Sequence, residues 1–163
     1  MKKSIIYSLA IALVTLVVAC GEDSDSSEGP TANVNPSVDR GIIEANDSTT
    51  FRMLLTDSVS KTWDASVFLL AGSNTFTSCR LDDYFTFFTD GTYDYSGGRL
   101  CGAEDTDKNR SGSWELDYTD KKIYFDRRTS KEYVAEVIGL QENELKVVGS
   151  YMRMEVRATY TVR

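Results

Sequence analysis

The sequence DYFTFFTDGTYDYS, residues 83–96, decides the fold of this chain. It reads as two short aromatic strands joined at Asp90-Gly91, a dipeptide typical of tight β-hairpin turns. Side chains alternate between the two faces of a strand, so the register of the hairpin determines which rings lie together. The turn conformation is therefore the first thing to establish.

Two registers are compatible with this turn. A two-residue turn would divide the aromatic rings between the two faces of the hairpin. A three-residue loop with a G1 bulge, in which Gly91 takes the left-handed conformation, instead pairs Phe87 with Tyr93. Phe85 then pairs with Tyr95, and four rings gather on one face. We predict this second register because it forms one aromatic core face.

From residue 62 onward the chain continues in short, aromatic and β-branched segments separated by turn residues. A short helix or cap is expected before them, over residues 51–58. The final segment alternates most regularly, with apolar residues at 154, 156, 158, 160 and 162. The eight expected strands are 63–70, 83–88, 92–96, 112–118, 122–126, 132–140, 144–151 and 154–162.

Eight antiparallel strands in chain order would leave two exposed edges unless the sheet closes on itself. We therefore expect an all-β fold, an antiparallel up-and-down eight-stranded barrel, rather than a sandwich. Such a barrel is wide enough either to be filled by side chains or to hold one small ligand. The residues expected to point inward are Trp63, Phe85, Phe87, Tyr93, Tyr95, Trp114, Leu116, Tyr118, Ile123, Phe125, Tyr133, Val137, Leu145, Val147, Val156 and Tyr160.

The first twenty residues indicate export and anchoring. Lys2 and Lys3 precede an apolar run that is too short to span a bilayer comfortably, as in a secretory signal peptide. The sequence VVAC, residues 17–20, has the form of a bacterial lipobox, so we expect residues 1–19 to be a lipoprotein signal peptide and Cys20 to be lipidated. An ordinary cleaved signal with an incidental cysteine is the alternative.

The 163 residues carry a formal net charge of -7, which argues against nucleic acid or anionic lipid as a partner. Residues 20–50 are rich in Ser, Asp, Glu, Asn and Gly, and we expect them to form a lipid-anchored, acidic, flexible linker before a domain at 51–163. The acidic run at 22–25 resembles a surface-export signal of Bacteroidota-type lipoproteins. A spacer facing the periplasm is the alternative.

The folded part contains a set of uncommon residues at characteristic spacings: Lys61-Thr62-Trp63, Cys79, Asp82, Asp83, Phe87, Asp90-Gly91-Thr92-Tyr93, Cys101 and Gly112-Ser113-Trp114-Glu115-Leu116. This pattern resembles that of the lipocalin-like domains of Bacteroidota-type lipoproteins. The resemblance covers about one hundred residues and implies the fold and the cell envelope, with no assigned ligand or reaction. A typical ligand-carrying lipocalin is longer, so a roomy cavity does not follow from it.

The cysteines fit an exported protein. With Cys20 lipidated, Cys79 and Cys101 remain as a pair in an oxidising compartment, and we expect a structural disulfide that closes a loop of about twenty residues. A metal pair or a redox couple fits poorly, because the sequence has no histidine and no Cys-x-x-Cys. The oligomeric state is not indicated.

Acidic residues are the remaining candidates for chemistry. Asp82, Asp83 and the acids at 104, 105 and 107 could supply oxygen ligands to a hard cation, but no EF-hand spacing is present. Turn capping by Asp82 or Asp83 is favoured over a metal site. Without histidine or a Gly-x-Ser-x-Gly motif, we expect no enzymatic activity, no catalytic residues, no metal and no cofactor.

Two functions stay open. The first is a barrel that binds a small hydrophobic or aromatic molecule through its aromatic interior. The second is a structural or protein-interaction lipoprotein whose barrel is filled by its own side chains. The volume of the interior cavity would discriminate between them. The residues expected to line a ligand site are Trp63, Phe85, Phe87, Tyr93, Tyr95, Trp114 and Tyr133.

Overall fold

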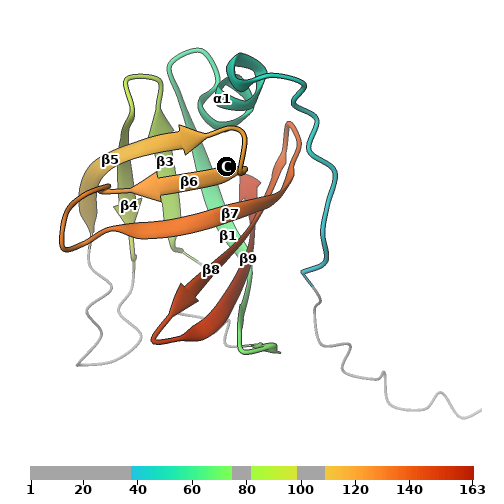
Figure 1. The fold of residues 1–163 in the computed structure, drawn as a ribbon, viewed down its shortest axis with the longest axis vertical. Helices are drawn as coiled ribbons and strands as arrows, with labels where there is room; N and C mark the ends of the chain where they lie inside the picture. Colours follow the sequence, from blue (N-terminus) through green and yellow to red (C-terminus); the bar gives the residue numbers. More distant parts are fainter. Residues whose placement is uncertain (1–37, 75–81, 99–108) are drawn as a thin grey trace, which may run out of the picture. The chain divides into compact units, whose positions relative to one another are not determined.

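One antiparallel sheet organises the computed structural model of the protein (Figure 1). The structure describes residues 38–74, 82–98 and 109–163, all within the unit Val34–Arg163. A single helix, α1 (Ser48–Thr56), precedes the sheet in this part of the chain. The strands are β1 (Ser60–Leu70), β2 (Ser73–Asn74), β3 (Tyr84–Phe88), β4 (Thr92–Ser96), β5 (Arg110–Asp117), β6 (Lys122–Phe125), β7 (Tyr133–Leu140), β8 (Glu144–Tyr151) and β9 (Met154–Val162).

The sheet closes into a barrel of eight strands. Strands β3 to β8 each pair with the next strand in the chain, and β1 pairs with β3 on one side and with β9 on the other. The two-residue strand β2 only folds back on the end of β1. Because both edges are joined, no long edge remains open among these strands. The expected antiparallel eight-stranded barrel is confirmed.

The aromatic hairpin adopts the predicted register. Phe87 pairs with Tyr93, and Phe85 pairs with Tyr95. Gly91 has a φ of +86°, a left-handed conformation that suits a residue without a Cβ, and its N–H donates to the Phe88 carbonyl at 3.2 Å. The rings of Phe85 and Tyr95 lie with their centroids 4.7 Å apart. The turn thus places four rings inside the barrel.

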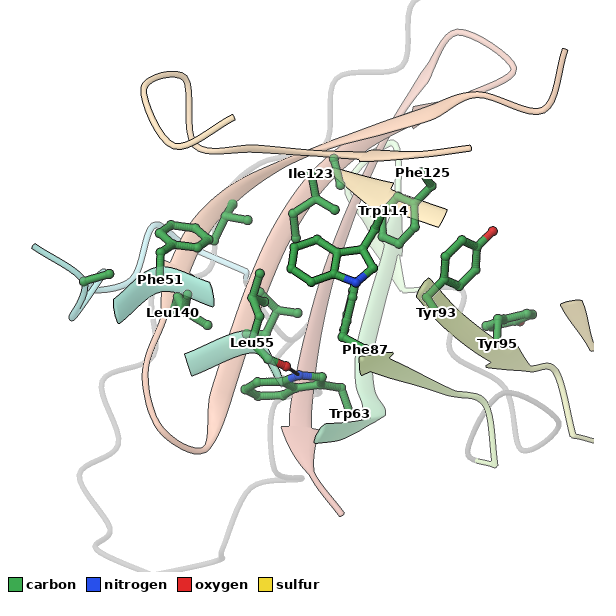
Figure 2. Packing of buried hydrophobic residues seen from close by; sticks show 14 residues of the cluster. Phe51, Leu55, Trp63, Phe87, Tyr93, Tyr95, Trp114, Ile123, Phe125 and Leu140 are labelled. Carbon is green, nitrogen blue, oxygen red and sulfur yellow. Dashed lines mark hydrogen bonds between the residues drawn. The ribbon is translucent and has the colours of Figure 1, made fainter. Parts of the chain in front are cut away.

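Helix α1 covers one end of the barrel (Figure 1). Asp47 caps it by accepting a hydrogen bond from the Thr50 N–H at 2.8 Å, so it starts three residues before the expected boundary. Its side chains Phe51 and Leu55 are fully buried, and the Leu55 carbonyl accepts a hydrogen bond from the Trp63 indole at 2.9 Å (Figure 2). No helix among the described residues is long and apolar enough to cross a membrane.

The segment before α1, residues 38–46, packs along β7. The Gly41 N–H donates to the Ile138 carbonyl and the Glu44 N–H to the Leu140 carbonyl, both at 2.9 Å. Val38 is buried against Ile138. Residues 38–50 of the expected flexible linker therefore belong to the folded unit. The composition of this segment did not indicate that it folds, because its few apolar residues are spread among polar ones.

A β-bulge in β1 changes which alternate residues of the strand face the barrel interior. Between Ala65 and Val67 the pairing with β9 shifts by one residue. Val67 therefore turns outward into a small cluster with Val38 and Ile138, whereas Phe68 turns inward. The residues expected to point inward all belong to the main hydrophobic cluster, except Val156, which is buried with 6% of its surface exposed.

Candidate functional site

An apolar cavity of about 60 Å³ lies inside the barrel. Six of the eight long strands contribute to its wall, which places it across the interior rather than between two neighbouring strands. None of the described residues that line it carries a charge. The lining residues are Trp63, Phe68, Phe85, Phe87, Ile123, Phe125, Tyr133, Ala135, Leu145, Val147, Val156, Ala158 and Tyr160.

Four of the seven expected ligand-site residues line this cavity: Trp63, Phe85, Phe87 and Tyr133. Tyr93, Tyr95 and Trp114 belong to the same hydrophobic cluster but do not line it. These three lie on β4 and β5, the two strands that make no contribution to the wall. The sequence therefore indicated which residues face the barrel interior. It did not distinguish those that line the cavity from those that pack against other side chains, such as Tyr93, Tyr95 and Trp114.

Trp114 belongs to the filled part. Its ring packs edge-on against Phe87 with centroids 5.5 Å apart, and its indole N–H donates to the Phe88 carbonyl at 3.1 Å. The guanidinium of Arg52 covers the ring at 4.6 Å from its centroid. With 2% of its surface exposed, Trp114 is a core residue that supports the cavity wall (Figure 2).

Tyr93 is held by a carboxylate. Its hydroxyl donates to Asp126 Oδ2 at 2.9 Å, while Asp126 Oδ1 accepts the Ser113 N–H at 3.0 Å. A Cβ at Gly112 would overlap the Asp126 carboxylate and would lie 2.7 Å from Tyr93 Cε1. This explains the glycine two residues before Trp114. Burial, together with the hydrogen bond to Asp126, raises the pKa of Tyr93 to about 12.

Tyr95 is held in the same way by Asp83. Its hydroxyl donates to Asp83 Oδ2 at 3.2 Å, and Asp83 is buried with 5% of its surface exposed. The Arg110 guanidinium lies 4.9 Å from the centroid of the Tyr95 ring. Each tyrosine of β4 is therefore positioned by an aspartate from outside that strand.

The wall of the cavity also contains rings that are less tightly packed. Phe85, Tyr133 and Tyr160 belong to the barrel interior, yet each keeps an intermediate share of its surface accessible. The Tyr133 hydroxyl lies where a side chain of residue 149 would be, so only glycine fits at Gly149. These rings border the void on one side and other aromatic rings on the other: Phe85 contacts Tyr160, and Tyr133 contacts Phe125.

A second hollow, of about 160 Å³, lies between α1 and the β3–β4 turn. Its residues are mostly polar and exposed, and it is separate from the barrel interior. The residues around it are Ser48, Thr49, Arg52, Met53, Thr56, Asp57 and Thr89. An open depression on the surface encloses little of a ligand, so the interior cavity is the stronger candidate site.

Several expected sites fall outside the described residues: the lipidation site Cys20, the cysteines Cys79 and Cys101, and the acids at 104, 105 and 107. Within the described ranges, no group of three or more His, Cys, Asp or Glu residues is placed to hold a metal ion. The residues expected to point inward did not include Phe68, Ala135 and Ala158 of the cavity wall, and the sequence did not connect Asp126 with Tyr93. Regular alternation along β1 does not predict Phe68 as an inward residue, because the bulge shifts the alternation. The contact of Asp126 with Tyr93 could not be predicted because the two residues are far apart in the sequence.

A closed eight-stranded antiparallel barrel with an apolar interior defines a small barrel protein of the lipocalin-like class. The sequence model of the lipocalin-like domain family matches residues 22–147, well over half of the chain, and the protein belongs to this family. The match ends within β8 and does not include β9. A search of curated proteins gave no significant match.

Proposed function

We propose that this protein is an envelope-anchored lipoprotein whose barrel binds a small hydrophobic or aromatic ligand. The observation that carries the proposal is the cavity of about 60 Å³, which is lined by aromatic and aliphatic side chains and by no charged residue that the structure describes. Apolar cavities with few polar groups are typical of small-molecule sites. Membership of the lipocalin-like family supports the same reading.

The anchor is proposed from the sequence. The two lysines, the apolar run and the VVAC sequence that ends at Cys20 support lipid attachment to the cell envelope, as an outer-membrane lipoprotein of the Bacteroidota type. The acidic run at 22–25 supports exposure at the cell surface. We propose a non-enzymatic role, which the absence of histidine from the sequence supports.

The size of the cavity favours a second candidate function. Ligand pockets are usually about 300–1,000 Å³, and this cavity is well below that range. Near α1, the interior is filled by Leu55, Trp63 and Phe87, all almost fully buried (Figure 2). A barrel packed in this way could act as a structural or protein-interaction lipoprotein. Direct measurement of ligand retention separates the two functions.

The experiment is native mass spectrometry of the full protein after exposure to an extract of envelope lipids and small metabolites. We expect a discrete added mass that is lost in the variant Val147→Phe, because Val147 lines the cavity and a phenylalanine would fill it. The matched control is Val59→Phe, at a position with 68% of its surface exposed. Bare wild-type protein under all conditions would favour the filled barrel.

The anchor is tested separately. Cells that express the protein are labelled with a radioactive fatty acid, and we expect label in the wild type but not in Cys20→Ser. Label in both proteins would contradict lipidation at Cys20. Protease treatment of intact cells then determines the orientation: degradation of the barrel supports surface exposure, whereas full protection supports a domain that faces the periplasm.

A further inference from the structure

The hydroxyl of Tyr160 is one of three polar side-chain groups on a mostly apolar wall, counted among the described lining residues. Tyr160 lies on β9, where it pairs with Leu145 of β8 and with Ala65 of β1, and its ring meets Phe85 edge-on at 5.9 Å between centroids. Among the described lining residues, the other polar side-chain groups are the Trp63 indole and the Tyr133 hydroxyl. These three groups differ in what they contact.

Trp63 donates its indole N–H to the Leu55 carbonyl, and the Tyr133 hydroxyl lies against Gly149. Among the described residues neither the Tyr133 nor the Tyr160 hydroxyl has a hydrogen-bond partner, but the Tyr133 hydroxyl is packed against the backbone of Gly149. Burial is the main cause that raises the pKa of Tyr160, so the hydroxyl stays protonated at neutral pH. The Tyr160 hydroxyl is not fully enclosed by protein atoms, so a molecule in the cavity that Tyr160 lines can supply a hydrogen-bond partner.

The size and charge of the site restrict that molecule. A dry cavity of about 150 Å³ accepts a benzene ring, so about 60 Å³ admits at most one ring, after small shifts of Phe85 and Tyr133. No charged side chain is among the described lining residues, so an ionised group would lose its hydration without gaining a counter-ion. The site therefore suits an uncharged molecule.

We propose that the cavity binds a small neutral molecule, with an apolar body no larger than one ring and one hydroxyl or carbonyl group that hydrogen-bonds to the Tyr160 hydroxyl. This inference rests on the proposed function and adds the chemical class of the ligand. Toluene and phenol are suitable probes, because they have nearly the same shape and differ by one hydroxyl. Benzoate adds a charge to the same ring.

The test is titration of the full protein with each probe by calorimetry. We expect phenol to bind about three to ten times more tightly than toluene, the effect of one net hydrogen bond, and benzoate to bind more weakly than either. In Tyr160→Phe the preference for phenol should disappear while the affinity for toluene changes less than twofold. In Tyr151→Phe, at an exposed position, both affinities should be unchanged.

The outcomes separate the inference from the proposed function. If toluene binds and phenol binds no more tightly, or if Tyr160→Phe keeps the preference for phenol, the role of Tyr160 is wrong while the apolar site stands. If benzoate binds most tightly, the neutral ligand class is wrong. If none of the three probes binds the wild-type protein, this inference is overturned together with a binding role for small single-ring molecules.

Discussion

Gly112 shows how one residue can be required by a contact made far away in the chain. It pairs with Tyr93 across β4 and β5, and the space that its side chain would occupy holds the carboxylate of Asp126. That carboxylate orients Tyr93 through the hydrogen bond at 2.9 Å. The glycine is thus part of a polar contact inside the barrel rather than of a turn.

We predict that Gly112→Ala lowers the free energy of unfolding by about 1–3 kcal/mol, the usual effect of excess volume in a packed interior. Urea denaturation measures the change. The control is Ser113→Ala, because the Ser113 side chain is exposed and only its backbone N–H binds Asp126. Equal free energies of unfolding for the two variants would show that the Asp126 carboxylate can move away from the new side chain without loss of stability.

The tyrosines of the interior predict a loss of stability in alkali. Burial raises the pKa of Tyr93 from 10.0 to about 12, and it raises the pKa of Tyr133 and Tyr160 as well. A pKa that is higher in the folded state means that ionisation favours the unfolded state. The contribution of Tyr93 to stability is therefore complete below about pH 10 and is lost as the pH rises toward 12.

Urea denaturation between pH 9 and pH 12 tests this. The free energy of unfolding of the wild type should fall across this interval, and that of Tyr93→Phe should fall less steeply, because one of the three raised pKa values is removed. Tyr124→Phe, on the outer face of β6, should follow the wild type. Identical slopes for wild type and Tyr93→Phe would contradict the prediction.

At the scale of elements, the β8–β9 hairpin has an unfavourable turn. Tyr151 pairs with Met154, so Met152 and Arg153 form a two-residue turn, and both have positive φ values, 49° and 67°. Such turns favour Asn-Gly, because bulky side chains are strained in this conformation. Met152 is also 74% exposed, so its side chain gains little from packing.

We predict that the double variant Met152→Asn, Arg153→Gly raises the free energy of unfolding by about 1 kcal/mol. The matched control is Thr119→Asn, Asp120→Gly in the β5–β6 turn, where neither residue has a positive φ. This control variant should show no increase in the free energy of unfolding. Thermal or urea denaturation of the two double variants decides the matter, and a gain in both would indicate a general effect of the Asn-Gly sequence.

At the scale of the whole molecule, the two residues that flank the aromatic hairpin, Asp82 and Gly98, lie against each other. A Cβ at Gly98 would overlap the Asp82 carboxylate, so residues 82 and 98 are in contact. Cys79 and Cys101 are each three residues away along the chain. This contact supports the expected disulfide, which itself lies outside the described residues.

We predict that the purified, unreduced protein shows no titratable thiol from Cys79 or Cys101 when it is unfolded in urea. Reduction should expose two thiols and lower the free energy of unfolding by about 3 kcal/mol, the effect of opening a loop of this length. Cys79→Ser should expose one thiol without reduction. Two free thiols in the unreduced wild type would contradict the disulfide.

The hairpin register and the number of barrel strands followed from local sequence patterns, whereas closure was inferred from the need to pair both edges of the sheet. The hairpin register was predictable from Gly91 and the alternating aromatics, and the number of strands from the turn residues between apolar segments. These features depend on interactions between neighbours in the chain. The lipid anchor and the acidic segment after it were also read from the sequence, and they stay predictions.

Only the tertiary structure decided which interior residues line a void. The bulge in β1 turned Phe68 inward, Asp126 fixed Tyr93 from 33 positions away, and residues 38–46 packed on β7. Each of these contacts joins segments that are distant in sequence, and their geometry depends on how the whole barrel closes. Alternation along a strand identifies the inner face, but the space left inside depends on all eight strands together.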